Sequence, residues 1–347
     1  MMQRCSRKQH SKGRILWWCL SLALFSAGRS ASAPKSLQPG TELSLRDVPF
    51  KIVYESYKET DGKQNWELML VNADGSAPAN LTKTGGVDEM YPHACDDGSK
   101  ICFVADEGSG RDKVRSVYYM NIDGSGRVKV AHNARQPCWS PDGKKIAYLK
   151  AEYTRYTTRD YASKGVFVYD LDSSAHREHC NGKLHHLYNL CWSPDAKWFL
   201  ATVHGGMGFK HAILAFPADG EEVSDLTKFG VTGCRPDLSP DGKMVTWGKT
   251  DWDLYVGKID LSATPRVSKV HALVKCEKTH EVYHTDFSPD GRYIAFSYGP
   301  KAEEQVGRPA PGWNICVADL GGNWVQITTD GDHNKEPDWV PTPASGH

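Results

Sequence analysis

A single phrase recurs along this chain of 347 residues and limits the folds that it can adopt. It reads "PCWSPDGKKIAYLK" from residue 137, and the sequence Ser-Pro-Asp returns at three further places. A degenerate copy, "YPHACDDGSKICFVAD", lies upstream, and "KEPDWVPT" near the end of the chain resembles the first half of the phrase. The copies lie about 45 to 53 residues apart, with anchors at Asp97, Asp142, Asp195, Asp241, Asp290 and Thr342. Repetition at this period is typical of proteins that stack one supersecondary unit several times.

The chemistry of the phrase predicts a tight turn between two strands. Proline fixes φ at the second position of a type I turn, aspartate suits the third, and glycine accepts the left-handed conformation that follows. A second hairpin follows in most repeats, for example at the Asp-Gly pair of "VYYMNIDGSGRVKV". Ala196 replaces the glycine in one copy, and we expect this change to cost about 1 kcal/mol if φ is positive there.

Each repeat therefore predicts two hairpins, which form a four-stranded antiparallel sheet that must be covered on both faces. A closed ring of such sheets provides that cover. The segment "FKIVYES" (50–56) matches the strand after the turn, whereas "KEPDWVP" (335–341) matches the strand before it. The sequence thus predicts an all-β protein, a six-bladed β-propeller of four-stranded antiparallel blades whose ring is closed by the C-terminal strand. A ring of seven blades stays open as an alternative.

The repeat also predicts the domain boundaries. A signal peptide (1–33) and a short linker (34–49) precede the propeller (50–342), and a tail (343–347) follows it. The predicted blades are blade 1 (50–84 plus 335–342), blade 2 (88–131), blade 3 (133–181), blade 4 (185–228), blade 5 (232–275) and blade 6 (280–329).

The N-terminus has the three-part layout of a secretory signal. A basic stretch precedes the apolar run "ILWWCLSLALF" (15–25), and small residues follow it. Eleven apolar residues are too few for an ordinary membrane span, which needs about 20. We therefore expect a periplasmic or secreted protein without a stable membrane span. Retention of the run as an anchor, and cleavage after Gly28 rather than Ala33, stay open.

Composition argues against nucleic acid as a partner and allows an estimate of the state of the thiols. Lys plus Arg and Asp plus Glu both number 42, so no basic surface for nucleic acid is expected. Eight cysteines remain beyond the signal. We expect most of them to be small buried thiols rather than disulfides, and we expect a monomer.

The phrases "PCWSPDGKKIAYLK" and "LVNADGSAPANLT" resemble the propeller of TolB, the periplasmic partner of the Tol–Pal system, and the wider group of TolB-like bacterial propellers. The resemblance covers about residues 50 to 342. It implies a propeller in the cell envelope, but it says little about function, because propellers serve many roles. We expect no counterpart of the N-terminal α/β domain of TolB, because only the linker separates the signal from the first blade.

The candidate binding site follows from propeller topology. The segments that lead into the inner strands all emerge on one face, which we call the funnel face. The predicted ligand-binding residues lie just before the proline position of each repeat or one step earlier: Tyr91, Arg135, Gln136, Tyr188, Asn189, Arg235, Tyr283, His284 and Glu336. These residues favour a non-catalytic module that binds a protein or an oligosaccharide and needs no cofactor. Two long loops (151–165 and 299–313) are expected on the same face, and the tyrosines and arginines of the first suit protein or sugar recognition.

Histidines in these segments leave an enzyme open as the alternative. His186, His284 and His333 would converge in a ring and could bind a divalent metal. Oligogalacturonate lyases look broadly similar and have a His-rich metal site at such a mouth, so a metal-dependent polysaccharide lyase or hydrolase is the second hypothesis. No Gly-x-Ser-x-Gly motif supports a serine hydrolase.

Overall fold

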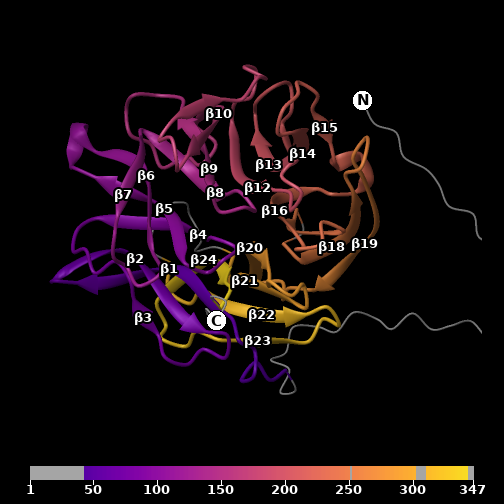
Figure 1. The fold of residues 1–347 in the computed structure, drawn as a ribbon. Helices are drawn as coiled ribbons and strands as arrows, with labels where there is room; N and C mark the ends of the chain where they lie inside the picture. The colour runs from indigo at the N-terminus through magenta and orange to yellow at the C-terminus, as the bar shows by residue number, and fades with distance from the viewer. Residues whose placement is uncertain (1–42, 251, 302–309, 343–347) are drawn as a thin grey trace, which may run out of the picture. The chain divides into compact units, whose positions relative to one another are not determined.

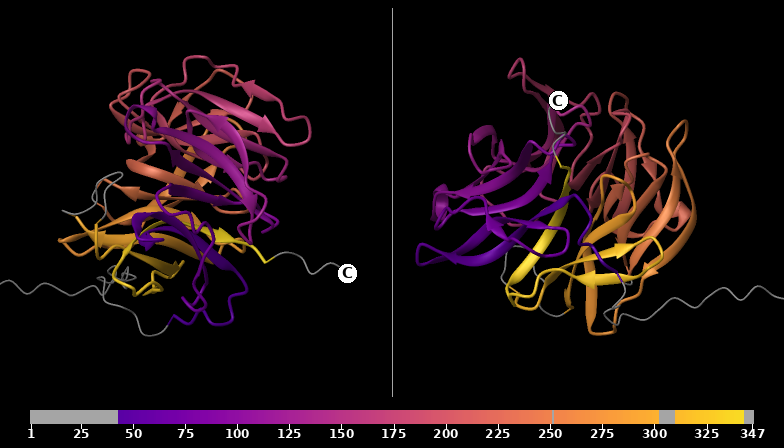
Figure 2. Two further views of the ribbon diagram at one scale, coloured as in Figure 1. Left: turned by 90° about the vertical axis from the view of Figure 1, so that its left-hand side faces the viewer. Right: turned by 60° about the horizontal axis from the view of Figure 1, so that its bottom comes forward.

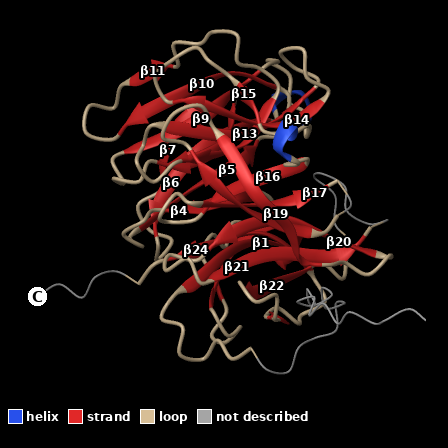
Figure 3. Cartoon of the chain, turned by 90° about the vertical axis from the view of Figure 1, so that its right-hand side faces the viewer, coloured by secondary structure: helices blue, strands red, loops and turns tan. Residues whose placement is uncertain are grey.

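The computed structural model of the protein describes residues 43–250, 252–301 and 310–342. These residues belong to one compact unit, Pro34–His347. The predicted signal peptide and tail lie outside the described residues. Within the described part, strands account for nearly all regular structure (Figure 3). The two helices there are short 3-10 turns, η1 (Gly110–Asp112) and η2 (Thr227–Phe229).

Six four-stranded antiparallel sheets are arranged in a ring, which confirms the predicted six-bladed propeller (Figure 1). The first three blades, from the inner strand outward, are β24 (His333–Val340), β1 (Lys51–Thr60), β2 (Lys63–Asn72), β3 (Ala79–Asn80); β4 (Asp88–Ala94), β5 (Lys100–Glu107), β6 (Val114–Asn121), β7 (Val128–His132); and β8 (Ala134–Trp139), β9 (Lys145–Ala151), β10 (Ser163–Asp170), β11 (His176–Glu178). The other three are β12 (Leu187–Trp192), β13 (Trp198–His204), β14 (His211–Pro217), β15 (Ser224–Asp225); β16 (Gly233–Leu238), β17 (Met244–Lys249), β18 (Leu254–Asp260), β19 (Arg266–Val274); and β20 (His280–Phe287), β21 (Tyr293–Pro300), β22 (Asn314–Asp319), β23 (Trp324–Gln326).

The two ends of the propeller meet in one blade. β24 pairs antiparallel with β1, with Trp339 opposite Ile52 and His333 opposite Tyr57. Figure 2 shows this yellow C-terminal strand beside the indigo N-terminal strands. The inner strand of blade 1 is thus supplied from the far end of the sequence, as predicted.

The repeated turn forms by the mechanism that its residues predict. Ser140 Oγ lies 2.5 Å from Asp142 Oδ1 and accepts the N–H of Lys145 at 2.9 Å. Gly143 has a φ of 65°, in the left-handed region. Ala196, its counterpart in blade 4, has a φ of 60°, so the positive φ considered from the sequence is present there.

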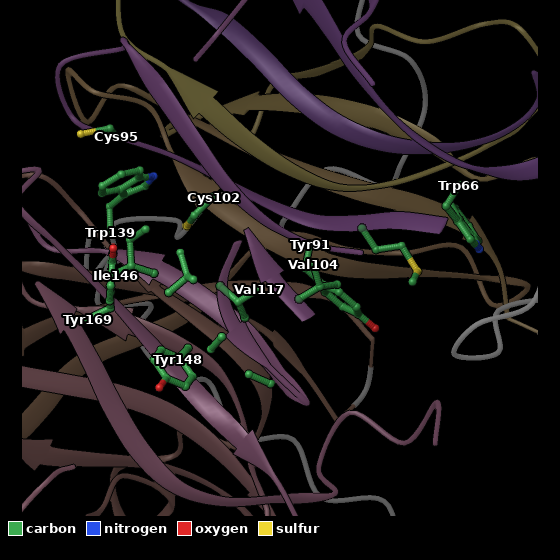
Figure 4. Packing of buried hydrophobic residues seen from close by; sticks show 14 residues of the cluster. Trp66, Tyr91, Cys95, Cys102, Val104, Val117, Trp139, Ile146, Tyr148 and Tyr169 are labelled. Carbon is green, nitrogen blue, oxygen red and sulfur yellow. The ribbon is translucent and has the colours of Figure 1, made fainter. Parts of the chain in front are cut away.

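The apolar core lies between neighbouring blades. One cluster joins Trp66 of blade 1, Val104 and Val117 of blade 2, and Trp139 and Tyr148 of blade 3 (Figure 4). Such contacts bury both faces of each sheet, which is what a four-stranded sheet cannot do alone.

All eight cysteines in the described residues are free thiols, and most are buried, as expected. Burial raises the pKa of Cys95 to about 11, so this thiol is protonated at neutral pH. Cys180 is exposed. Within the described residues, we find no helix with the length and apolar character needed to cross a membrane.

Candidate functional site at the funnel face

Each inner strand carries the same irregularity at its predicted funnel residue. Pairing with the second strand shifts register at this point in all six blades, for example between Arg135 and Cys138 in β8. A bulge of this kind bends a strand and re-aims a side chain. The residues at these positions all have a left-handed φ between 51° and 58°: Tyr91, Gln136, Asn189, Arg235, His284 and Glu336.

Proline follows four of these six residues, for example Arg235 and Glu336. Proline has no N–H to donate, so it suits a bulge, where one ladder position is unpaired. The sequence pattern that marked the funnel residues therefore marks a backbone feature as well.

The bulges bring the predicted residues together at the centre of the ring, where the labels of the inner strands gather in Figure 1. A narrow cavity of about 60 Å³ is lined by five of them, namely Tyr91, Gln136, Asn189, His284 and Glu336. A wider cavity of about 450 Å³ beside it is lined by Tyr188, Arg235 and Tyr283. We call the wider one the funnel cavity.

A loop of blade 3 inserts into this face. We call residues 152–162, between β9 and β10, the plug loop. Its Asp160 is buried and accepts hydrogen bonds from Arg235 Nη2 at 2.8 Å and from the Tyr91 hydroxyl at 2.6 Å. Arg235 Nη1 also binds Glu336 at 2.9 Å, and Glu336 lies 2.8 Å from His284 Nε2. Four predicted residues and one unforeseen aspartate thus form one buried polar network.

Arg235 is the positively charged centre of this network and binds two carboxylates. Burial alone would lower the pKa of this guanidinium, but the carboxylates of Glu336 and Asp160 raise it well above its ordinary value. The ring of Tyr188 lies 5.5 Å from the guanidinium carbon, within cation–π range. Arg235 is therefore a fixed positive charge whose partners come from the plug loop and from β24.

Arg135 lies under the same loop without a carboxylate bonded to it. Its Nη1 donates to the carbonyl of Arg159, and its Nη2 lies 3.4 Å from the carbonyl of Thr157. Its Nε has no hydrogen-bond partner among the described residues. Burial, and then repulsion from Arg115, lower the pKa of Arg135 to about 10.

Aromatic side chains form part of the walls of the funnel cavity, beside charged groups such as Arg159 and Lys249. Tyr188 and Tyr283 were predicted from their places before the bulges, but Tyr161 and Trp252 were not singled out as site residues. His204 and His211 complete this side of the cavity. The length and the tyrosines of the plug loop were visible in the sequence, whereas the place of Trp252 depends on how β17 and β18 are joined.

The three predicted metal ligands each have a protein partner. His186 Nε2 lies 3.1 Å from Glu152, His284 lies between Glu336 and Ser297, and His333 Nδ1 accepts the N–H of Ala310 at 2.8 Å. Over residues 43–250, 252–301 and 310–342, no group of three or more His, Cys, Asp or Glu side chains is placed to hold a metal. The metal site stays a prediction, which metal analysis of the purified protein would test.

The opposite end of the ring, where the inner strands finish, carries carboxyls that were not predicted as site residues; Asp338 is buried, Asp237 and Asp286 are half-buried, and Asp96 is exposed. A cavity of about 260 Å³ there is lined by Asp96, Asp237, Asp286 and Asp338. The last three stand two positions after a bulge residue, and each accepts a backbone N–H from the inner strand of the next blade. These hydrogen bonds link Asp237 to blade 6, Asp286 to blade 1 and Asp338 to blade 2.

These carboxyls hold their protons to unusually high pH. Burial raises the pKa of Asp237 to about 6, and burial together with Asp96 raises that of Asp338 to about 8. Burial, and then the neighbouring Asp338 and Asp237, raise the pKa of Asp286 well above its ordinary value. The physical cause is the cost of placing several negative charges together away from water.

Comparisons with known proteins find similar structures but no similar sequences. No protein-family model matches the chain, and no curated protein matches it by sequence. TolB from Acinetobacter baumannii matches in structure with a TM-score of 0.62 at 17% identity, over 84% of this chain and 67% of that one. A putative TolB from Agrobacterium tumefaciens matches with a TM-score of 0.56 at 16% identity, over 84% of this chain and 99% of that one. A chain of the nidogen/laminin complex matches with a TM-score of 0.57 at 9% identity, over 84% of this chain and 98% of that one.

Identities this low establish the fold alone, and they agree with the resemblance carried by the repeated phrase. The order of strands within each sheet and the closure of blade 1 by β24 point the same way. The chain is a six-bladed β-propeller with the TolB-like fold, closed by its C-terminal strand.

Proposed function

We propose that this chain is an exported binding module that holds a protein or glycan ligand at its funnel face, without catalysis of its own. The observation that carries the proposal is the funnel cavity of about 450 Å³, walled by Tyr161, Tyr188, Trp252 and Tyr283. Export is inferred from the basic, apolar and small-residue segments of residues 1–33.

The size and lining of the cavity support a binding role. Ligand sites are typically concave, hold a few hundred cubic ångströms, and combine apolar walls with a few fixed polar groups. Here the polar groups include Arg235 and Asp160, both buried. Tyrosine, tryptophan and arginine are also the side chains that contribute most to protein interfaces.

Two buried polar atoms in the narrow cavity point the same way. Gln136 Nε2 and Asn189 Oδ1 have no hydrogen-bond partner among the described residues. Both residues line that cavity. Buried amide groups are normally satisfied, so water or a ligand group is expected to fill their hydrogen bonds.

A screen for ligands tests the proposal. The mature protein would be used to probe envelope proteins by crosslinking and an oligosaccharide array, and the affinity of each hit would be measured by calorimetry. We expect Trp252→Ala to weaken the true ligand about tenfold or more, because truncation of a central aromatic anchor costs about 2 kcal/mol. Phe229→Ala is the matched control, since this half-exposed aromatic does not line the cavity. A ligand that binds both variants as tightly as the wild type would refute the choice of face.

A further inference from the structure

We propose that the plug loop is an internal stand-in for a peptide segment of a partner protein that carries an aspartate or glutamate. Such a segment would displace the loop, place its carboxylate on Arg235, and offer main-chain carbonyls to Arg135. This inference rests on the proposed function and deepens it, because it names the class of ligand and the way in which the site is kept closed.

The first step concerns the carboxylate. Asp160 is the one acidic side chain that the plug loop places between Arg235 and the Tyr91 hydroxyl, at 2.8 and 2.6 Å. The other carboxylate on Arg235 belongs to Glu336 of the closing strand β24. When the loop leaves, Arg235 keeps one carboxylate partner and loses the other, so a place for one incoming carboxylate opens at a buried arginine.

The second step concerns the main chain. Arg135 binds the plug loop through the carbonyl oxygens of Thr157 and Arg159. Only 2% of the surface of Arg135 is exposed, and its Nε has no hydrogen-bond partner among the described residues. From the plug loop, the two arginines therefore contact one carboxylate and two peptide carbonyls, which are the groups of a polypeptide. A uronate chain would supply the carboxylate but not the carbonyls.

The third step concerns the cost of displacement. Within the plug loop, only Asp160 and the small Ala162 are buried. The loop is instead held by polar contacts, such as Tyr156 to Asp106 and Glu152 to His186. Its departure exposes little apolar surface, and an incoming peptide replaces its hydrogen bonds with equivalent ones. Segments with few buried apolar contacts open at the lowest free-energy cost.

The fourth step concerns the neighbouring space. Tyr161 follows Asp160 directly and lines the funnel cavity together with Tyr188, Trp252 and Tyr283. A peptide that placed its carboxylate where Asp160 lies would direct its next side chain into this aromatic cavity. Aromatic or long apolar residues after the acid would therefore bind most tightly.

The loop itself supplies the probe for a test. A fluorescent, end-capped peptide with the sequence of residues 155–162 would be titrated by anisotropy into a variant in which residues 153–160 are replaced by a Gly-Ser segment of equal length. We expect binding at least about tenfold tighter than to the wild type, because the wild-type site is occupied by its own loop. Replacing the aspartate of the peptide by asparagine, or Arg235 by alanine in the host, should remove the gain.

Further arms keep the test decisive. Asp160→Asn in the full chain, verified as folded by circular dichroism, should also bind the peptide more tightly than the wild type. Trigalacturonate is the competing probe, and tighter binding of this sugar than of the peptide would overturn the inference. Equal binding of the aspartate and asparagine peptides would overturn it as well. If a ligand from the screen above depends on Trp252 but does not compete with the peptide, the inference fails while the proposed function stands.

Discussion

We expect the free energy of unfolding to fall as the pH rises from 5 to 8, because the carboxyls at the far end of the ring have raised pKa values. Asp237, Asp286 and Asp338 are protonated in the folded chain at pH values where they are ionised in the unfolded chain. Because the folded pKa is the higher one, their stabilising contribution is complete below the ordinary pKa of 3.8 and is lost as the pH rises through about 6 for Asp237 and about 8 for Asp338. Asp96, whose pKa is also raised, and His93, whose pKa is lowered by burial, face the same cluster.

The magnitude follows from linkage. A carboxyl that titrates near 8 when folded and at 3.8 when unfolded lowers the free energy of unfolding by about 4 kcal/mol between pH 5 and pH 8. The carboxyls interact electrostatically and line a cavity that solvent reaches, so we expect a net loss of about 2 to 3 kcal/mol. Asp338→Asn keeps an oxygen to accept the N–H of Ala94 but cannot ionise. This variant should therefore flatten the profile and exceed the wild type in stability at pH 8.

Urea unfolding followed by tryptophan fluorescence, at intervals from pH 5 to pH 8, measures both effects. The matched control is Asp241→Asn in a surface turn. The bond from Ser239 lowers the pKa of Asp241, so its contribution is lost only in acid below this range. A wild-type stability that is flat or rises over the range would refute the reasoning, as would an Asp338→Asn profile with the wild-type slope.

Three further outcomes are expected from local geometry. Ala196→Gly should raise the free energy of unfolding by about 1 kcal/mol, because the φ of 60° strains a side chain; an unchanged urea midpoint would contradict this. Gly299→Ala should lower it by about 3 kcal/mol, because the new Cβ would lie 2.3 Å from the buried ring of Trp313, whereas Gly182→Ala, with open space around its Cβ, should have little effect on the same midpoint. Deleting residues 333–347 removes β24 and leaves β1 as an open inner edge, so hydrogen exchange in blade 1 should rise sharply; protection equal to that of the intact chain would show that β24 does not close the ring.

The plug loop shows where sequence reasoning stopped. The tyrosines and arginines of residues 151–165 suggested a recognition loop, but nothing in the order of residues said that Asp160 would bond to Arg235, 75 positions away. Sequence distance carries no information about which rim residue a long loop meets. The funnel residues, by contrast, could be aligned in advance, because every repeat places them at the same step before its turn.

The carboxyl cluster makes the same point at the other end of the ring. Asp237, Asp286 and Asp338 occupy equivalent places in three repeats, and these places can be aligned from the sequence. The electrostatic interaction among the three carboxyls cannot be predicted in this way, since it depends on the ring bringing blades 5, 6 and 1 together around one cavity. A raised pKa requires both burial and neighbours, and both are properties of the closed ring.

The sequence by itself determined the blade and the closing strand and favoured six blades over seven, because turn chemistry and strand alternation act over a few residues and repeat along the chain. Tertiary structure decided which side chains became neighbours at the two ends of the ring. There, Asp160 closes the funnel face and the pKa values of three aspartates are raised, because closure places residues from distant repeats close together and away from water.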